Sequence, residues 1–95
     1  MTIPTSGAAR DLSIASLSGS SQPVEVANSG RRFLQVENTG NANIGLNYCG
    51  GTAVIGGTGT FTIAPGDRLT LDWWVPTNAI AVIGTASQPV SIAVG

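Results

Sequence analysis

The sequence contains no histidine and no lysine, and only nine of its 95 residues are charged. Nucleophilic catalysis by serine, cysteine or threonine needs a neighbouring base, which is usually histidine. The carboxylates show neither the spacing of an acid–base pair nor that of a calcium loop. We therefore predict that the protein is not an enzyme and has no catalytic residue, no metal site and no cofactor. The five carboxylates are Asp11, Glu25, Glu37, Asp67 and Asp72.

Basic patches and long apolar runs are absent as well. A net charge of −1 provides no stripe of cations to neutralise phosphates, which argues against nucleic acid as a partner. No apolar run approaches the roughly 18 residues of a membrane span. The first residues have neither a basic nor an apolar segment of the secretory type, so we expect synthesis in the cytoplasm without export by a signal peptide.

Charge is scarce enough to affect the surface. The charged fraction is 9%, against about a quarter in ordinary soluble domains. The surface must therefore be covered by serine, threonine, asparagine, glycine and alanine. Such a surface is poorly protected against self-association. This composition indicates a protein that is normally bound within a larger assembly.

Residues 31–48 organise the rest of the chain. Leu34 and Val36 alternate with polar residues, and so do Ile44, Leu46 and Tyr48. Period-two alternation is typical of half-buried strands. The link 38–43 is rich in asparagine and glycine, residues that favour tight turns. We therefore predict two strands that form a hairpin.

Further short strands follow from the same alternation, and no stretch shows helical spacing. Pro65-Gly66 predicts a type II turn. The chain is predicted to be an all-β, antiparallel sandwich or jelly-roll-like domain of about seven to nine short strands, and an immunoglobulin-like topology fits equally well. The β-sandwich domain covers 23–95, and 1–22 is either an extended N-terminal arm or an edge strand around 11–15. The additional strands are predicted at 24–26, 52–55, 60–63, 68–74, 79–83 and 90–94.

Two features have a simple structural interpretation. Five glycines in residues 50–59 resemble a phosphate loop, but the required lysine is missing and no helix pattern follows. Cys49 has no partner in its own chain for a disulfide. We predict that it is a small buried apolar residue near a strand end, with an intermolecular disulfide as the alternative.

Trp73 and Trp74 are adjacent, and adjacent strand residues point to opposite faces. Continuing the alternation of Leu69 and Leu71, Trp73 is predicted in the core and Trp74 on the outer face. Trp74 then contacts a partner or another subunit, is covered by a loop of its own chain, or stacks on carbohydrate.

Arginines supply a second set of interface candidates. Arg31 and Arg32 precede a strand and are interpreted either as a docking anchor or as a solvated strand start. An ion pair of Glu37 or Asp72 with Arg32 or Arg68 is also expected. The complete set of predicted interface residues is Arg31, Arg32, Trp74, Arg68, Leu12 and Ile14.

From residue 30 to residue 95 the chain resembles small virion proteins of tailed bacteriophages. The motifs are Arg-Arg-Phe-Leu at 31–34 with Asn38, Gly-Gly-Thr-Ala at 50–53, Ala-Pro-Gly at 64–66, and Val-Pro-Thr-Asn-Ala at 75–79 followed by Val-Ile-Gly at 82–84. Members of this family look like compact β domains attached to the outside of the particle. They have no catalytic residues to transfer to this sequence.

The resemblance implies a capsid decoration or cement protein, made in the host cytoplasm and located on the capsid exterior of the virion. Its implied partners are the major capsid protein and further copies of itself, often as a homotrimer. A head or tail fibre component or collar adaptor is the alternative, and a carbohydrate-binding module is a further one. The sequence ends soon after the last strand, which favours decoration over a fibre.

Overall fold

In a computed structural model, which describes residues 8–95, the chain folds into eight short β-strands. No helix occurs in these residues, and so none of them forms a helix long and apolar enough to cross a membrane. The strands are β1 (Arg10–Asp11), β2 (Gln22–Glu25), β3 (Leu34–Glu37), β4 (Ile44–Asn47), β5 (Thr60–Ile63), β6 (Arg68–Leu71), β7 (Ile80–Ile83) and β8 (Ser91–Val94).

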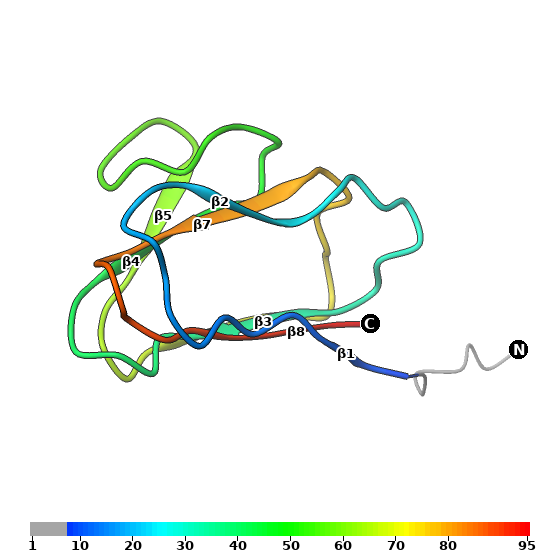
Figure 1. The fold of residues 1–95 in the computed structure, drawn as a ribbon. Helices are drawn as coiled ribbons and strands as arrows, with labels where there is room; N and C mark the ends of the chain where they lie inside the picture. The colour runs from blue at the N-terminus through cyan, green and yellow to red at the C-terminus, as the bar shows by residue number, and fades with distance from the viewer. Residues whose placement is uncertain (1–7) are drawn as a thin grey trace, which may run out of the picture.

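The strands form two antiparallel four-stranded sheets that face each other as two layers (Figure 1). The strand order is β1-β8-β3-β6 in one sheet and β2-β7-β4-β5 in the other. Eight antiparallel strands in two sheets with these strand orders form a jelly roll. The predicted all-β sandwich is confirmed, and of the two topologies that fit the sequence the structure has the jelly roll.

The predicted hairpin of residues 31–48 is wrong, although both of its strands exist. β3 pairs with β6 and β8, whereas β4 pairs with β5 and β7 in the opposite sheet. The link 38–43 therefore crosses between the layers. Alternation specifies which side chains face the core, and two strands in opposite layers satisfy it as well as two strands in a hairpin. Only β4 and β5 are both consecutive in the chain and neighbours in a sheet.

The core lies between the inner faces of the two sheets. Leu34 and Val36 of β3 are fully buried, and so are Ile44 and Leu46 of β4. The predicted inner face of the last strand is confirmed, because its three alternating apolar side chains are buried. The other buried members of this core cluster are Leu17, Ile63, Ile80, Val82, Val90, Ile92 and Val94.

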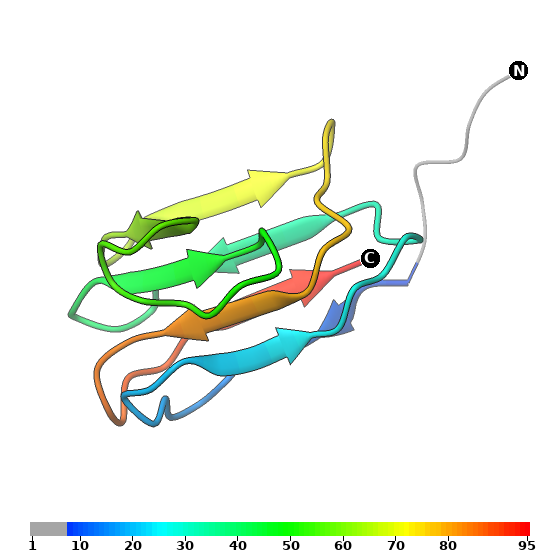
Figure 2. The same cartoon turned by 90° about the horizontal axis from the view of Figure 1, so that it is seen from above.

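The described part of the N-terminal segment, residues 8–22, follows the edge-strand alternative. The N–H groups of Leu12 and Ile14 donate to the carbonyl oxygens of Ile92 and Val90, each at 2.9 Å. Leu17 is buried in the core. This segment is thus an integral edge of the sandwich, seen beside β8 in Figure 2. The first seven residues of the predicted arm lie outside the described residues.

The predicted strand 60–63 is confirmed as β5, and so is the turn after it. Gly66 has a φ of +82°, and the N–H of Asp67 donates to the carbonyl of Ala64 at 3.0 Å, as a type II turn requires. The strand expected at 52–55 is not formed, because residues 48–59 make a loop. The predicted strand 68–74 is shorter than expected, since β6 ends at Leu71 and the chain then bends.

Candidate interaction surface

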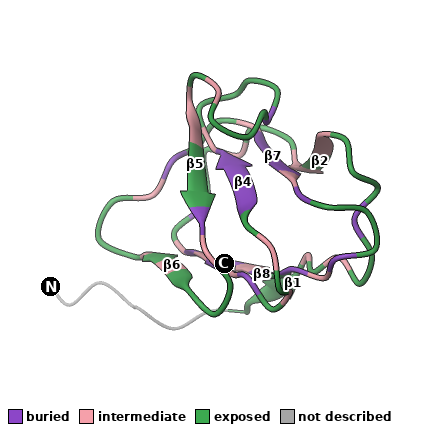
Figure 3. Cartoon of the chain, turned by 90° about the vertical axis from the view of Figure 1, so that its left-hand side faces the viewer, coloured by how far each residue is buried: buried purple, intermediate pink, exposed green. Residues whose placement is uncertain are grey.

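The two sides of the sandwich are closed differently. At the β1–β2 side an ion pair joins Arg10 of one sheet to Glu25 of the other. At the β5–β6 side the register places Phe61 opposite Leu46, so Phe61 belongs to the inner face, yet 46% of its surface is exposed. Leu69 and Leu71 of β6 also face inward and are only half-buried. Figure 3 shows exposed ribbon on β5 and β6 at this side. The apolar interior thus reaches the surface there.

Three aromatic side chains cover this opening. Tyr48, directly after β4, stacks on Phe61 with ring centroids 4.8 Å apart and planes 9° apart. Trp74 meets Tyr48 edge to face at a centroid distance of 6.3 Å. Such pairs contribute about 0.5–1.5 kcal/mol beyond their buried area. We call Tyr48, Phe61 and Trp74 the aromatic cluster. It holds its rings in a fixed arrangement while 53% of Trp74 stays exposed.

The prediction that Trp73 lies in the core is wrong. Its side chain is 86% exposed, because β6 ends before it and the alternation of Leu69 and Leu71 does not continue through the bend at 72–74. The predicted exposure of Trp74 is confirmed, but its predicted place on the outer face of a strand is not, because it lies in the bend after β6 and meets Tyr48, which continues the inward-facing alternation of β4. Both tryptophans are therefore exposed, Trp74 as a member of the aromatic cluster and Trp73 as its neighbour in the chain. Large apolar side chains exposed together are typical of interaction sites.

Arg31 holds the segment that carries these tryptophans. Its Nε donates to Oε1 of Glu25 at 2.7 Å, and its Nη1 donates to the carbonyl oxygens of Pro76 and Asn78 at 2.5 and 3.0 Å. Its Nη2 donates to the carbonyl of Val26 at 3.2 Å. We call Glu25 and Arg31 with these carbonyls the Arg31 network. It fixes the link between β6 and β7 from inside.

Both interpretations of Arg31, as a surface docking anchor and as a solvated strand start, are therefore wrong. Only 3% of the residue is exposed, and its donors are used within its own chain. Arg32, in contrast, is exposed. The guanidinium of Arg31 is buried because four acceptors surround it, and a buried charge requires such partners.

Two opposing effects set the pKa of Glu25. Burial of its side chain raises the pKa, while the hydrogen bonds and positive charges of Arg10 and Arg31 lower it, and the balance lies below the ordinary value of 4.5. The carboxylate is therefore stabilised in its charged form in the folded protein. Because the folded pKa is depressed, this stabilisation is present above pH 4.5 and is lost as the pH falls through the folded pKa.

We expect the wild-type protein to lose stability on acidification from pH 6 to pH 3 more steeply than the variant Glu25→Gln. The variant lacks the titrating carboxylate, so the part of the slope that comes from Glu25 disappears. Urea unfolding followed by circular dichroism at each pH measures the slopes. Equal slopes would show that Glu25 does not contribute to the pH dependence.

The remaining predicted residues are dispersed. Leu12 and Ile14 pack against the core of their own chain at the β1 edge. Arg68 is exposed on β6 at the opposite edge, and Glu37 is its register partner on β3. Neither the expected ion pair of Glu37 nor that of Asp72 is formed, since the ion pairs among residues 8–95 both use Glu25.

Cys49 was predicted to be buried, and this is wrong: it is exposed. The side chain of Asn47 accepts the N–H of Cys49 at 2.9 Å, and the chain then turns at Gly50, whose φ is +90°. Cys49 continues the alternation of Gly45 and Asn47, whose side of β4 is opposite to that of the core residues Ile44 and Leu46.

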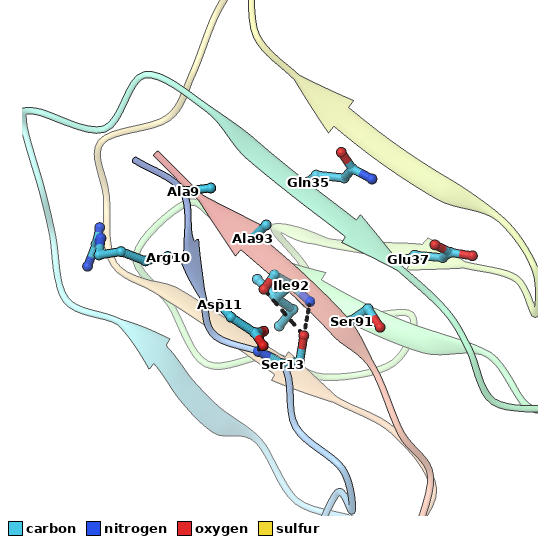
Figure 4. Close-up of a pocket in the computed structure, with 9 residues that line it drawn as sticks. All are labelled: Ala9, Arg10, Asp11, Ser13, Gln35, Glu37, Ser91, Ile92 and Ala93. Atoms are coloured by element: carbon cyan, nitrogen blue, oxygen red, sulfur yellow. Dashed lines mark hydrogen bonds between the residues drawn. The ribbon is translucent and has the colours of Figure 1, made fainter. Parts of the chain in front are cut away.

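A depression of about 240 Å³ lies on the outer face of β8 between β1 and β3 (Figure 4). Its floor holds the small side chains of Ser91 and Ala93, and Asp11 and Glu37 stand at its sides. The hydroxyl of Ser13 accepts the N–H of Ile92 at 2.9 Å, which ties the edge segment to β8. No group of three or more metal-ligating side chains occurs in the described part of the chain. The depression exists because the side chains of β8 that form its floor are small.

The comparisons support the fold. No protein-family model matches the sequence, and no curated protein matches it. The chain is similar to the solved structure described as "Bacillus endospore appendages form a novel family of disulfide-linked pili", with 13% identity and a TM-score of 0.52 over 99% of this chain and 90% of that one. A de novo designed double-stranded β-helix is 12% identical, with a TM-score of 0.49 over 93% of this chain and 96% of that one. At 13% identity the pilus likeness shows a shared fold alone.

Sequence reasoning missed Phe61 and Tyr48 as surface residues. Both continue the inward-facing alternation of their strands, which predicts burial. Phe61 is exposed and Tyr48 is only half-buried because β5 and β6 are the last strands of their sheets on the same side, so no further strand covers these rings. The sequence did contain a signal for this surface, because four of its five aromatic residues lie in or close to the consecutive strands β4, β5 and β6.

Proposed function

We propose that the chain is a structural virion protein of a tailed bacteriophage, which binds the outside of the capsid as a decoration protein and stabilises the head. The observation that carries this proposal is the aromatic cluster with Trp73, exposed on a domain that has almost no charge. Tryptophan and tyrosine are enriched among the residues that dominate binding energy at protein interfaces. The virion motifs of residues 30–95 point to the capsid as the partner.

In this proposal the major capsid protein contacts the aromatic cluster and Trp73, while the buried Arg31 network keeps the tryptophan segment in one conformation. Preorganisation of this kind lowers the entropy that binding must overcome. The protein acts without catalysis, as one of several copies on the particle exterior. A fibre or collar adaptor would use the same surface against a different component of the virion.

The test is binding to heads of the encoding phage prepared without the protein. We expect the variant Trp73→Ser/Trp74→Ser to bind at least about 30-fold more weakly than the wild type, as expected for loss of a hot spot of about 2 kcal/mol. The variant Val26→Ser is the matched control, because Val26 is an apolar side chain 79% exposed outside the aromatic cluster. Sedimentation with the heads measures binding.

Unchanged head binding by the tryptophan variant would contradict the proposed contact surface. Wild-type binding to tails or fibres, but not to heads, would replace decoration by the adaptor role. Binding to glycans and to no virion component, abolished by Trp74→Ala, would replace both by a carbohydrate-binding role.

A further inference from the structure

The four edge strands of the two sheets differ in how well they are protected against pairing with another chain. β1 is only two residues long and consists of Arg10 and Asp11. β2 contains Pro23, and its register shifts between Pro23 and Glu25. Short length, charge, proline and a bulge are the features by which proteins protect sheet edges. The β1–β2 side therefore carries these protective features.

The other side has less protection, and β6 has the least. On β5 the hydroxyl of Thr60 accepts the N–H of Val54, so the loop 48–59 contacts that strand. β6 pairs with β3 over four consecutive residues without a shift and contains no proline. It is the last strand of its sheet, as the yellow strand in Figure 2 shows. Main-chain groups of β6 that point away from β3 thus have no strand partner among residues 8–95.

The sequence of this edge is complementary to itself. Residues 68–72 read Arg-Leu-Thr-Leu-Asp, with Thr70 at the centre. If two copies pair antiparallel about Thr70 and the pairing extends one residue past the end of β6, Arg68 of each lies opposite Asp72 of the other. Leu69 then lies opposite Leu71, and Thr70 opposite Thr70. Opposite charges and paired threonines are both favourable cross-strand neighbours.

We propose that the β6 edge binds the β6 edge of a second copy of this chain by two-fold antiparallel pairing centred on Thr70. The pairing joins two four-stranded sheets into one sheet of eight strands and forms an interface with the same residues on both sides. Arg68 and Asp72 are exposed, and neither makes an ion pair within residues 8–95. Their charges are thus available to the second copy.

Neighbouring residues fit this partner as well. Arg68 already lies opposite Glu37 across β3, so the second copy would place it between two carboxylates. Leu69 and Leu71 are half-buried on the inner face, and a continued sheet covers them further. This contact between copies does not require a capsid. If the copies do not pair in solution, the proposed binding to heads is unaffected, because a separate experiment tests it.

Charge reversal tests the pairing. Sedimentation equilibrium should show a monomer–dimer equilibrium for the wild type. Arg68→Asp places two like-charged pairs in the dimer, and so does Asp72→Arg, and each should weaken dimerisation about tenfold or more. Arg32→Asp is the matched control, because Arg32 is exposed outside the strands, and it should dimerise like the wild type. Circular dichroism checks that each variant is folded.

Mixing the two reversed variants gives the sharper result. Arg68→Asp has acids at both positions and Asp72→Arg has arginines at both, so an equimolar mixture should form a heterodimer at least as tight as the wild-type dimer. A wild type that stays monomeric, or a trimer as the family resemblance implies, would overturn the proposal. Dimerisation equally strong in the single variants, or a mixture of folded variants that fails to associate, would overturn it too.

Discussion

Replacing Arg31 by methionine is expected to lower the free energy of unfolding by about 3–5 kcal/mol, the loss typical when one partner of a buried ion pair is removed. Methionine has a similar volume but donates no hydrogen bond. The carbonyl oxygens of Val26, Pro76 and Asn78 would each lose a hydrogen bond that Arg31 donates. Domains of this size are stable by about 5–15 kcal/mol, so the loss is a large part of the total.

Arg32→Met is the matched control for this experiment. The two arginines are adjacent, but Arg32 is exposed, so its substitution should change stability by no more than about 0.5 kcal/mol. Urea unfolding followed by circular dichroism measures both variants. If the two substitutions had equal effects, the network around Arg31 would not be the source of stability assigned to it.

Replacing Asn38 by leucine is expected to reduce the free energy of unfolding by about 3 kcal/mol, because buried groups lose their partners. Asn38 is fully buried, and its Nδ2 donates to the carbonyl oxygens of Ala42 and Ile63, each at 2.8 Å. Its Oδ1 accepts from the N–H of Gly40 and from Nε2 of Gln88, each at 3.0 Å. One side chain thus joins the link 38–43 to β5 and to the loop before β8.

The control is Asn43→Ala, in the same link but exposed, for which we expect a change within about 0.5 kcal/mol. Thermal unfolding gives a second readout, since about 3 kcal/mol corresponds to a decrease of more than 10 °C in a domain of this size. A decrease equal to that of the control would mean that the core and not Asn38 holds the crossing in place.

Most strands could be predicted because each is short, alternates cleanly and ends at a turn residue. β5 and the turn at Pro65-Gly66 are examples in which local sequence is sufficient. The pairing of β3 and β4 could not be predicted, since alternation fixes the buried face of a strand but not its neighbour. The polar link 38–43 fits a tight hairpin and a crossing between layers alike. The crossing is distinguished from a hairpin by Asn38, whose hydrogen-bond partners are distant in sequence.

The candidate surface was predicted in part. Trp74 was identified because two adjacent tryptophans in an extended segment point in different directions. Trp73 was misplaced because the strand ends three residues earlier than the pattern suggests. The burial of Arg31 depends on Glu25 and on the carbonyls of residues 76 and 78, which only the folded topology brings together. Interactions between distant segments are the part that a linear pattern does not contain.

The position of β8 has a consequence for how each copy is made. This strand contains residues 91–94 and lies between β1 and β3 in the interior of its sheet (Figure 2). During synthesis β1 therefore has no strand partner until residues 91–94 have left the ribosome, and the sheet is completed only then. Folding dominated by such distant pairings takes milliseconds to seconds. Throughout that time the β6 edge of a nascent chain is exposed to other chains, so the rate of folding helps to determine whether copies associate correctly or aggregate.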